Sequence, residues 1–438
     1  MAIRVLSAAI LAASVLSAQD TSSDLLDQAR DKILTSIRHL PNYTCLETID
    51  RTYYARPATK LSRHVMTEPP SPVAVCGGNG TAKPLREASD RLRMEVAVAG
   101  KYEIHSWPGA SRFDTRSIEQ IVPFGPMSTG SLGGYLSGIF FNPRAEIKFI
   151  GKKSHGDREV FEYSFRVPLE ASHYGVKGES GWKDTGYSGS FEINLATAEL
   201  ARLVIETDQL PLDTGICRVN HTLDYHFILI GHDEFLIPRR SEFETFDVDG
   251  GATNSVTAFS ACHEYTAESS IRFDDPAGSG NPITTAPKVA AALLSGIPMT
   301  LALIGGIDAQ SAAGDPVYAR VKKTIRAPGS KKVLVPAGAI AHGRILQMRY
   351  EYKTSEYVIG IRFDTLEING AVLPLSLKPG REVKPDSRES QGFVRRGAEF
   401  SLPSTVSVET GALIRVPAPL RGPVIPAGCE WAWVTVAR

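Results

Sequence analysis

The chain of 438 residues is long enough for two or three domains, and it has 48 Lys and Arg and 48 Asp and Glu, giving zero net charge. Its five cysteines form neither a CxxC pair nor another metal-type spacing, which argues against a zinc site. The zero charge conceals an asymmetry. Residues 20–285 hold 27 basic and 36 acidic side chains, a net −9, whereas residues 286–438 hold 20 and 12, a net +8. Such an asymmetry bears on partners, not on fold.

The first nineteen residues have the layout of a secretory signal peptide. Arg4 supplies the positive region, residues 5–16 the apolar region, and residues 16–19 a cleavage zone of small residues. We therefore expect residues 1–19 to be removed and the mature protein to be periplasmic or extracellular. The first cysteine, Cys45, lies too far downstream to carry a lipid anchor at the cleavage site.

The next segment predicts a helix over Asp24–Leu40, because its apolar residues recur at helical spacing and Pro41 ends the pattern. A period of two then predicts strands over Tyr43–Tyr54, Leu92–Ile104, Ile147–Val167 and Ser188–Ile193. One helix followed by antiparallel strands indicates a curved half-barrel sheet. Its apolar concave face must be covered by helices, by the second domain or by a ligand.

Three shorter patterns add detail to this first domain. Residues 222–238 predict a hairpin with a polar loop at Gly231–Glu234, and Asp247–Gly251 predicts another hairpin loop. The glycines of residues 130–134 have no phosphate-binding context and are expected to open a small helix over Tyr135–Phe141.

Export makes disulfides plausible, and we expect Cys45 to pair with Cys76 and Cys217 with Cys262. Cys429 is then left over, either as a buried free thiol or as a partner for a second chain.

Residues 217–232 hold the densest set of metal-competent side chains, namely Cys217, His221, His226 and His232. On a strand His221 and His226 point to opposite faces, so converging metal ligands are not expected. We predict no catalytic, metal or cofactor-binding residues from sequence motifs.

A cluster of Gly, Pro, Ser and Asp over residues 274–282 marks a linker. We expect an acidic domain over residues 20–275, a linker over 276–287 and a basic domain over 288–438. The apolar run Val289–Ile307 is interrupted by Pro298 near its middle and is therefore not expected to span a membrane.

The basic domain is expected to be a small β-barrel. Residues 357–368 alternate as a strand, and Asn369-Gly370 is a strong signal for a hairpin turn before the next strand, residues 371–377. Another strand, turn and strand are expected over residues 333–345, and the last strand over Trp431–Val436.

Two resemblances concern the first domain. The run Gly189–Leu203 resembles a hairpin of the outer-membrane lipoprotein carrier family, whose members are half-barrels that shield acyl chains. The segments Leu40–Cys45, Phe259–Tyr265 and Glu268–Phe273 resemble uncharacterised secreted proteins of acidobacteria, which implies an envelope with two membranes.

A third resemblance concerns the second domain. The segments Ile297–Leu301, Gly314–Val321 and Val335–Arg344 resemble the periplasmic β-barrel domain of the TrbI group of type IV secretion core proteins. The resemblance implies the barrel fold and carries no secretion role, because the rest of the chain departs from that group.

Two functions follow as hypotheses. The first is a non-enzymatic envelope protein that binds a lipid or other apolar ligand, with an anionic envelope component as a partner of the basic domain. Nucleic acid is not expected as a partner, because the protein is exported and lacks a basic groove with interleaved aromatic residues. The alternative is an envelope hydrolase whose carboxylates, for example Glu103 and Asp114 near Trp107, meet only in the fold.

Overall fold

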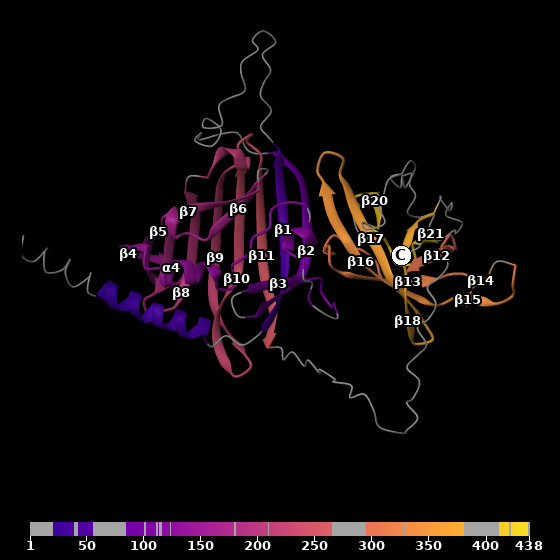
Figure 1. Cartoon of the computed structure of the whole chain (residues 1–438), viewed down its shortest axis with the longest axis horizontal. Helices are drawn as coiled ribbons and strands as arrows, with labels where there is room; N and C mark the ends of the chain where they lie inside the picture. Colours follow the sequence, from indigo (N-terminus) through magenta and orange to yellow (C-terminus); the bar gives the residue numbers. More distant parts are fainter. Residues whose placement is uncertain are drawn as a thin grey trace, which may run out of the picture. The chain divides into compact units, whose positions relative to one another are not determined.

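The computed structural model describes residues 21–38, 43–55, 85–99, 102–110, 113, 116–122, 124–178, 181–208, 210–264, 295–327, 329–380, 411–419 and 422–436 (Figure 1). The expected signal peptide, Cys76, Asp114 and the expected linker at 276–287 lie outside these residues. The chain divides into two compact units. Unit 1 comprises Met1–Glu87, Met94–Ser106 and Ala110–Tyr265, and unit 2 comprises Ala88–Arg93, Trp107–Gly109 and Thr266–Arg438.

The predicted fold class is confirmed, since strands dominate both units and helices are few. Unit 1 contains β1 (Tyr43–Ala55), β2 (Leu85–Ala99), β3 (Tyr102–Ser106), β4 (Glu146–His155), β5 (Arg158–Val167), β6 (Tyr174–Gly178), β7 (Gly181–Asn194), β8 (Leu200–Asp208), β9 (Ile216–Ile230), β10 (Asp233–Asp247) and β11 (Ala252–Glu264). Its short helices are α3 (Ile118–Ile121), α4 (Gly134–Phe140) and the 3-10 turns η1 (Leu169–Ala171) and η2 (Leu212–Thr214). None of the helices in the described part of the chain is both long and apolar enough to cross a membrane.

The strands of unit 1 form one curved sheet. Neighbouring strands follow the order β4, β5, β7, β8, β9, β10, β11, β1, β2, β3, and β6 pairs with β7. From β7 to β11 each strand pairs with the next one in sequence, as the hairpin predictions require. β11 instead pairs with β1, which is distant from it in sequence. This pairing joins β1, β2 and β3 to the rest of the sheet.

One face of this sheet is covered, and we call it the covered face. The helix at residues 21–38 begins three residues before the predicted start and packs there through Leu25, Ala29 and Ile33. The Oγ of Ser36 accepts the backbone N–H of Leu236 at 2.9 Å, and the hydroxyl of Tyr163 donates to the carbonyl of Ser22 at 2.6 Å. These bonds join both ends of the helix to strands β5 and β10.

The opposite face carries a row of charged residues in register across four strands. Glu162 on β5 faces Glu192 on β7, which faces Arg202 on β8, which faces Asp224 on β9. Lys153 lies 2.8 Å from Glu162 and 2.9 Å from Glu192, so its ammonium offsets the repulsion of the two carboxylates. Side chains of a strand alternate between faces, so this polar row leaves the covered face free for apolar residues.

Unit 2 is a small barrel-like sheet of β12 (Pro298–Leu303), β13 (Pro316–Val321), β16 (Ile340–Glu351), β17 (Glu356–Ile368), β18 (Ala371–Pro374), β19 (Leu377–Pro379), β20 (Ala412–Pro417) and β21 (Glu430–Thr435). Pairing runs from β21 through β12, β13 and β16 to β17, and then through β18. The chain continues from β18 into β19, which pairs with β21. A two-stranded ribbon, β14 (Ile325–Arg326) and β15 (Val333–Val335), forms a separate sheet.

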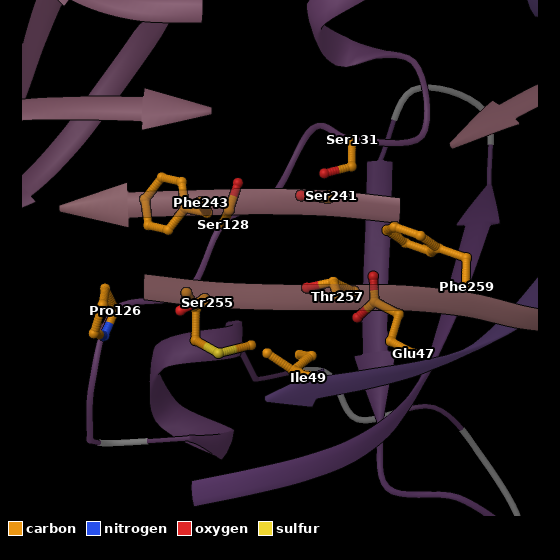
Figure 2. A pocket seen from close by; sticks show the side chains of 11 residues that line it. Glu47, Ile49, Pro126, Ser128, Ser131, Ser241, Phe243, Ser255, Thr257 and Phe259 are labelled. Atoms are coloured by element: carbon orange, nitrogen blue, oxygen red, sulfur yellow. The ribbon is translucent and has the colours of Figure 1, made fainter. Parts of the chain in front are cut away.

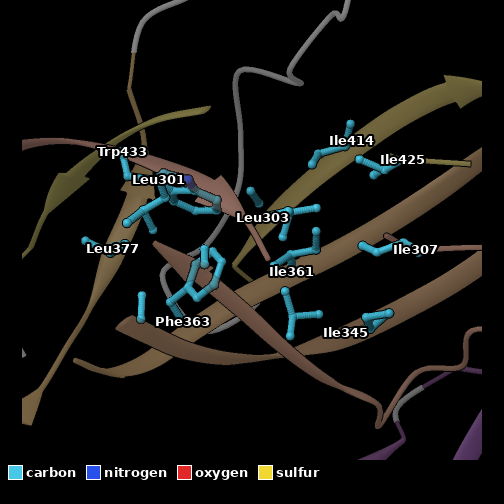
Figure 3. Close-up of a cluster of buried hydrophobic side chains, with 14 of the residues drawn as sticks. Leu301, Leu303, Ile307, Ile345, Ile361, Phe363, Leu377, Ile414, Ile425 and Trp433 are labelled. Atoms are coloured by element: carbon cyan, nitrogen blue, oxygen red, sulfur yellow. The ribbon is translucent and has the colours of Figure 1, made fainter. Parts of the chain in front are cut away.

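The core of unit 2 is aliphatic with one aromatic pair. Phe363 and Trp433 meet edge to face, with ring centroids 5.3 Å apart, among Leu301, Leu377 and Ile361 (Figure 3). The Asn369-Gly370 turn joins β17 to β18 as predicted, with both residues at positive φ, 51° and 81°.

Residues 88–93 of strand β2 belong to unit 2. Asp90 faces Arg349 of β16, Leu92 forms a bridge with Ala313, and the guanidinium of Arg93 is paired with the carboxylate of Asp315. A segment from the first half of the sequence thus completes the second unit.

Candidate binding site on the covered face of unit 1

The apolar half of the covered face is a continuous row of aromatic rings, which we call the aromatic row. Consecutive ring centroids along it lie 4.9–6.3 Å apart. In spatial order its members are Tyr135, Tyr174, Tyr187, Phe165, Phe191, Tyr163, Phe149 and Phe161. The row arises because β5 places an aromatic residue at every inward position over residues 161–165 and β7 does so at Tyr187 and Phe191.

The aromatic row is roofed by helices and not by a second sheet. Leu25, Ala29 and Ile33 of the helix at residues 21–38 belong to the same buried cluster as the row. Phe140 of α4 packs against Phe191, with ring centroids 4.8 Å apart. The pairings between the described strands do not involve this roof, although the backbone N–H of Leu236 on β10 donates to Ser36 of the helix.

The other half of the covered face carries buried polar side chains beside an apolar cluster and lies beneath residues 124–134, which we call the covering segment. Arg51 of β1, buried under it, donates from Nη1 to the carbonyl of Phe124 at 2.7 Å and lies 3.6 Å from the Sδ of Met127. Gly125 has a φ of +76°, and a Cβ there would lie 2.2 Å from the hydroxyl of Tyr53. Only glycine therefore fits this close approach of the segment to the sheet.

Glu103 of β3 holds the middle of the covering segment. Its Oε2 accepts the backbone N–H of Gly130 at 2.7 Å, and its Oε1 accepts that of Leu132 at 2.9 Å. Burial raises the pKa of this carboxyl above its ordinary value, and the two N–H bonds act in the opposite direction. The carboxylate thus satisfies two backbone donors of the covering segment.

Glu47 and His105 form a second buried contact, with Oε2 and Nε2 3.6 Å apart. Burial, followed by the charge of Glu103, raises the pKa of Glu47 to about 8, and burial lowers the pKa of His105 to about 4. Both shifts favour the uncharged forms, so at neutral pH this is a neutral pair and not a salt bridge.

His221 is the centre of a third polar group. Its Nε2 lies 2.5 Å from the Oγ of Ser241, and its Nδ1 lies 3.2 Å from the hydroxyl of Tyr135, which in turn lies 3.2 Å from the Oγ of Ser128. Burial lowers the pKa of His221 to about 3, so the imidazole is neutral and has one donor and one acceptor nitrogen. These contacts link β9 and β10 to α4 and to the covering segment.

A small cavity lies between these groups and has room for about one water molecule. Figure 2 shows Glu47, Ser241, Ser255 and Thr257 on the strand side of the cavity and Ser128 on the side of the covering segment. The buried Oγ of Ser255 has no hydrogen-bond partner among the described residues. The cavity is thus polar and too small for an organic ligand in this conformation.

The disulfide prediction is wrong in its pairing. Cys45 is bonded to Cys262, and Cys217 is also disulfide-bonded. The reason is the pairing of β1 with β11, which sets Thr44 opposite His263 and brings together cysteines 217 positions apart in sequence. Among the described cysteines, Cys429 is a free thiol.

The other predicted site residues are distributed as follows. Both carboxylate oxygens of Glu103 bind the covering segment, and its supposed partner Asp114 lies outside the described residues, so the hydrolase alternative stays a prediction. His221 is buried whereas His226 is half-buried, as expected for opposite faces of β9. In the described part of the chain, no three His, Cys, Asp or Glu side chains are grouped so as to hold a metal ion.

Comparison with known proteins gives one structural likeness. No protein family model matches the chain, and no curated protein matches it. A solved structure described as an outer membrane lipoprotein-sorting protein domain, from Vibrio parahaemolyticus, is similar with a TM-score of 0.24 and 10% sequence identity, over 56% of this chain and 95% of that chain. A likeness of this size supports no inference about function, and the resemblances to acidobacterial proteins and to the TrbI group stay predictions.

Proposed function

We propose that the protein is a non-enzymatic component of the cell envelope, and that unit 1 binds an apolar chain, such as a lipid acyl group, along the aromatic row. The observation that carries the proposal is the roof over this row. Seven of the eight rings lie on strands of the sheet, Tyr135 on α4 completes the row, and the pairings between the strands do not involve the helix at residues 21–38. A ligand can replace the helix at residues 21–38 on the rings without breaking a strand pairing.

The contacts of this helix support the proposal. Its three buried apolar residues, Leu25, Ala29 and Ile33, are small or medium in size, whereas the strands beneath contribute the large rings. Lys32 donates to the carbonyl of Thr197 at 2.6 Å from an exposed position. An apolar chain that covers the same rings would compete with these side chains for the apolar surface.

Export is part of the same proposal. The signal-like residues 1–19 are supported by the disulfide between Cys45 and Cys262, since disulfides persist in oxidising compartments such as the periplasm.

The test uses cis-parinaric acid, a fluorescent fatty acid, titrated into the exported full-length protein. We expect saturable binding with one dominant site, and competition by palmitate. The double variant Leu25→Ala/Ile33→Ala weakens the roof, and we expect it to bind the probe several-fold faster. The matched control Gln28→Ala/Asp31→Ala changes the exposed side of the same helix and should leave the rate unchanged.

Mass spectrometry of lipids extracted from protein purified without detergent provides the independent measurement. If neither the parent protein nor the roof variant binds the probe, although circular dichroism shows both to be folded, the aromatic row is a structural core and the proposal is wrong.

A further inference from the structure

The β14–β15 ribbon of unit 2 is distinguished by its charge. Residues 316–339 contain six Lys and Arg and no Asp or Glu, and five of these cations fall within residues 322–332. This is the densest basic stretch among the described residues of unit 2, whose other cations are interspersed with carboxylates.

The ribbon is a defined structure and stands apart from the barrel pairing. Ile325 faces Val335 and Arg326 faces Val333, and neither strand pairs with another strand in the described part of the chain. Figure 1 labels the two strands beside the sheet of unit 2. The backbone N–H of Ala327 donates to the carbonyl of Lys332 at 2.9 Å and so closes the turn. The cations are thus carried on a projecting, hydrogen-bonded hairpin.

Two of the five cations have partners in unit 2. Lys322 lies 3.0 Å from a carboxylate oxygen of Glu430, and the guanidinium of Arg326 donates to the carbonyl of Lys331 at 2.7 Å within the hairpin. The exposed ammonium groups of Lys323, Lys331 and Lys332 form no ion pair with any described carboxylate. They are available to an anionic partner.

The shape of the hairpin selects the kind of partner. A groove can enclose a flexible anionic polymer, whereas a protruding hairpin tip can contact a flat anionic surface. Here the turn residues Gly329 and Ser330 are small and exposed, and Val333 next to the lysine pair is 45% exposed. Lysines beside a small apolar contact suit the interface of a bilayer, where ammonium groups meet head groups and an aliphatic side chain reaches below them.

We propose that the β14–β15 hairpin docks unit 2 on a membrane surface rich in anionic phospholipid, through Lys323, Lys331 and Lys332 with Val333 beside them. This inference concerns unit 2 and does not depend on ligand binding by unit 1. Each lysine near an anionic surface strengthens binding roughly fivefold, so three contribute about 100-fold at low salt.

The experiment is flotation of the full-length protein with vesicles of phosphatidylcholine containing 30% phosphatidylglycerol (about physiological anionic content) or none. We expect binding only to the anionic vesicles, with at least about tenfold weakening in 0.5 M salt. The variant K323Q/K331Q/K332Q should bind at least about tenfold more weakly, and V333S more weakly by a smaller factor.

The control K148Q/K353Q/K378Q removes the same charge from exposed positions outside the hairpin and should bind like the parent. Equal losses in the two triple variants would show that net charge alone is responsible and would overturn the proposal. It is also overturned if the parent does not float with anionic vesicles, or if soluble polyphosphate binds the hairpin and vesicles do not.

Discussion

The side chain of Glu103 accepts the backbone N–H of Leu132 at 2.9 Å and thereby joins a strand of unit 1 to the segment that covers it. The same carboxylate accepts a second N–H, from Gly130. Backbone donors of a loop have no partners from a helix or a strand pairing, and here one side chain satisfies two of them. The covering segment is therefore held by hydrogen bonds to Glu103 and by the buried side chain of Leu132, whereas the helix at residues 21–38 buries an apolar stripe and is hydrogen-bonded to strands at its two ends.

Replacing Glu103 by Ala should destabilise unit 1 by about 2 kcal/mol, because two partly buried N–H groups lose their acceptor while one unfavourably buried carboxylate is removed. E103Q should lower the stability of unit 1 by less than E103A does, since Gln still offers one acceptor oxygen. Urea unfolding followed by circular dichroism measures the change. The control E162Q, on the opposite face and paired with Lys153, should change stability by less than about 1 kcal/mol. Equal effects of E103A and E162Q would contradict the anchoring role.

Stability should depend on pH through Glu47. Its folded-state pKa of about 8 exceeds its ordinary value of 4.5, so the folded state holds a proton that the unfolded state releases, and stability falls as pH rises from about 4.5 to 8. His105 and His221 have lowered pKa values of about 4 and 3, so they contribute stability that is lost as pH falls below 6.5. Because the contributions of Glu47 and of the two histidines change in opposite directions with pH, the net stability falls with rising pH only above pH 6.5.

The measurement is the melting temperature at constant ionic strength between pH 5 and 8.5. We expect it to fall by several degrees between pH 6.5 and 8 in the parent protein and by clearly less in E47Q, which copies the neutral carboxyl. A parent melting temperature that rises through this range would mean that Glu47 is ionised in the folded protein.

The sequence predicted those features of the fold that depend on neighbouring residues. The Asn369-Gly370 turn requires positive φ at two successive residues, which these two residue types tolerate, and the structure has them there. The polar loop at residues 231–232 between β9 and β10 and the short helix α4 after residues 130–133 were predicted for the same kind of local reason.

The site depends on contacts between distant segments, and sequence reasoning missed most of it. The Cys45–Cys262 bond follows from the pairing of β1 with β11, which no local pattern reveals. For Glu47, however, the sequence does contain a signal of burial. Tyr43, Cys45 and Ile49 mark the inward positions of β1, and a carboxylate among them predicts a buried polar contact. The donors that Glu103 binds lie 27 and 29 residues further along in a loop without a motif.

Unit 2 should depend on residues 88–93 of β2. Arg93 and Asp315 are mostly buried and paired, and Asp315 also accepts the backbone N–H of Ala312 at 2.9 Å. Arg93→Ala leaves this carboxylate without its cation and should destabilise unit 2 by about 1–3 kcal/mol, measured by urea unfolding with tryptophan fluorescence. Arg415→Ala removes a more exposed cation of unit 2, near Glu351, and should cost about 0.5 kcal/mol. A smaller effect at Arg93 than at Arg415 would show that the segment adds little to unit 2.

The bond between Cys45 and Cys262 should contribute more than any of these contacts. It closes a loop with a sequence separation of 217 residues and so restricts the unfolded chain strongly, which predicts a loss of about 3–5 kcal/mol in the variant Cys45→Ser/Cys262→Ser. Peptide mapping without reduction should recover the two cysteines in one linked fragment. Cys429→Ser removes the free thiol of unit 2 and serves as the control, with unchanged stability of unit 1. Recovery of Cys45 linked to any other cysteine would show that the exported protein does not pair β1 with β11 in this register.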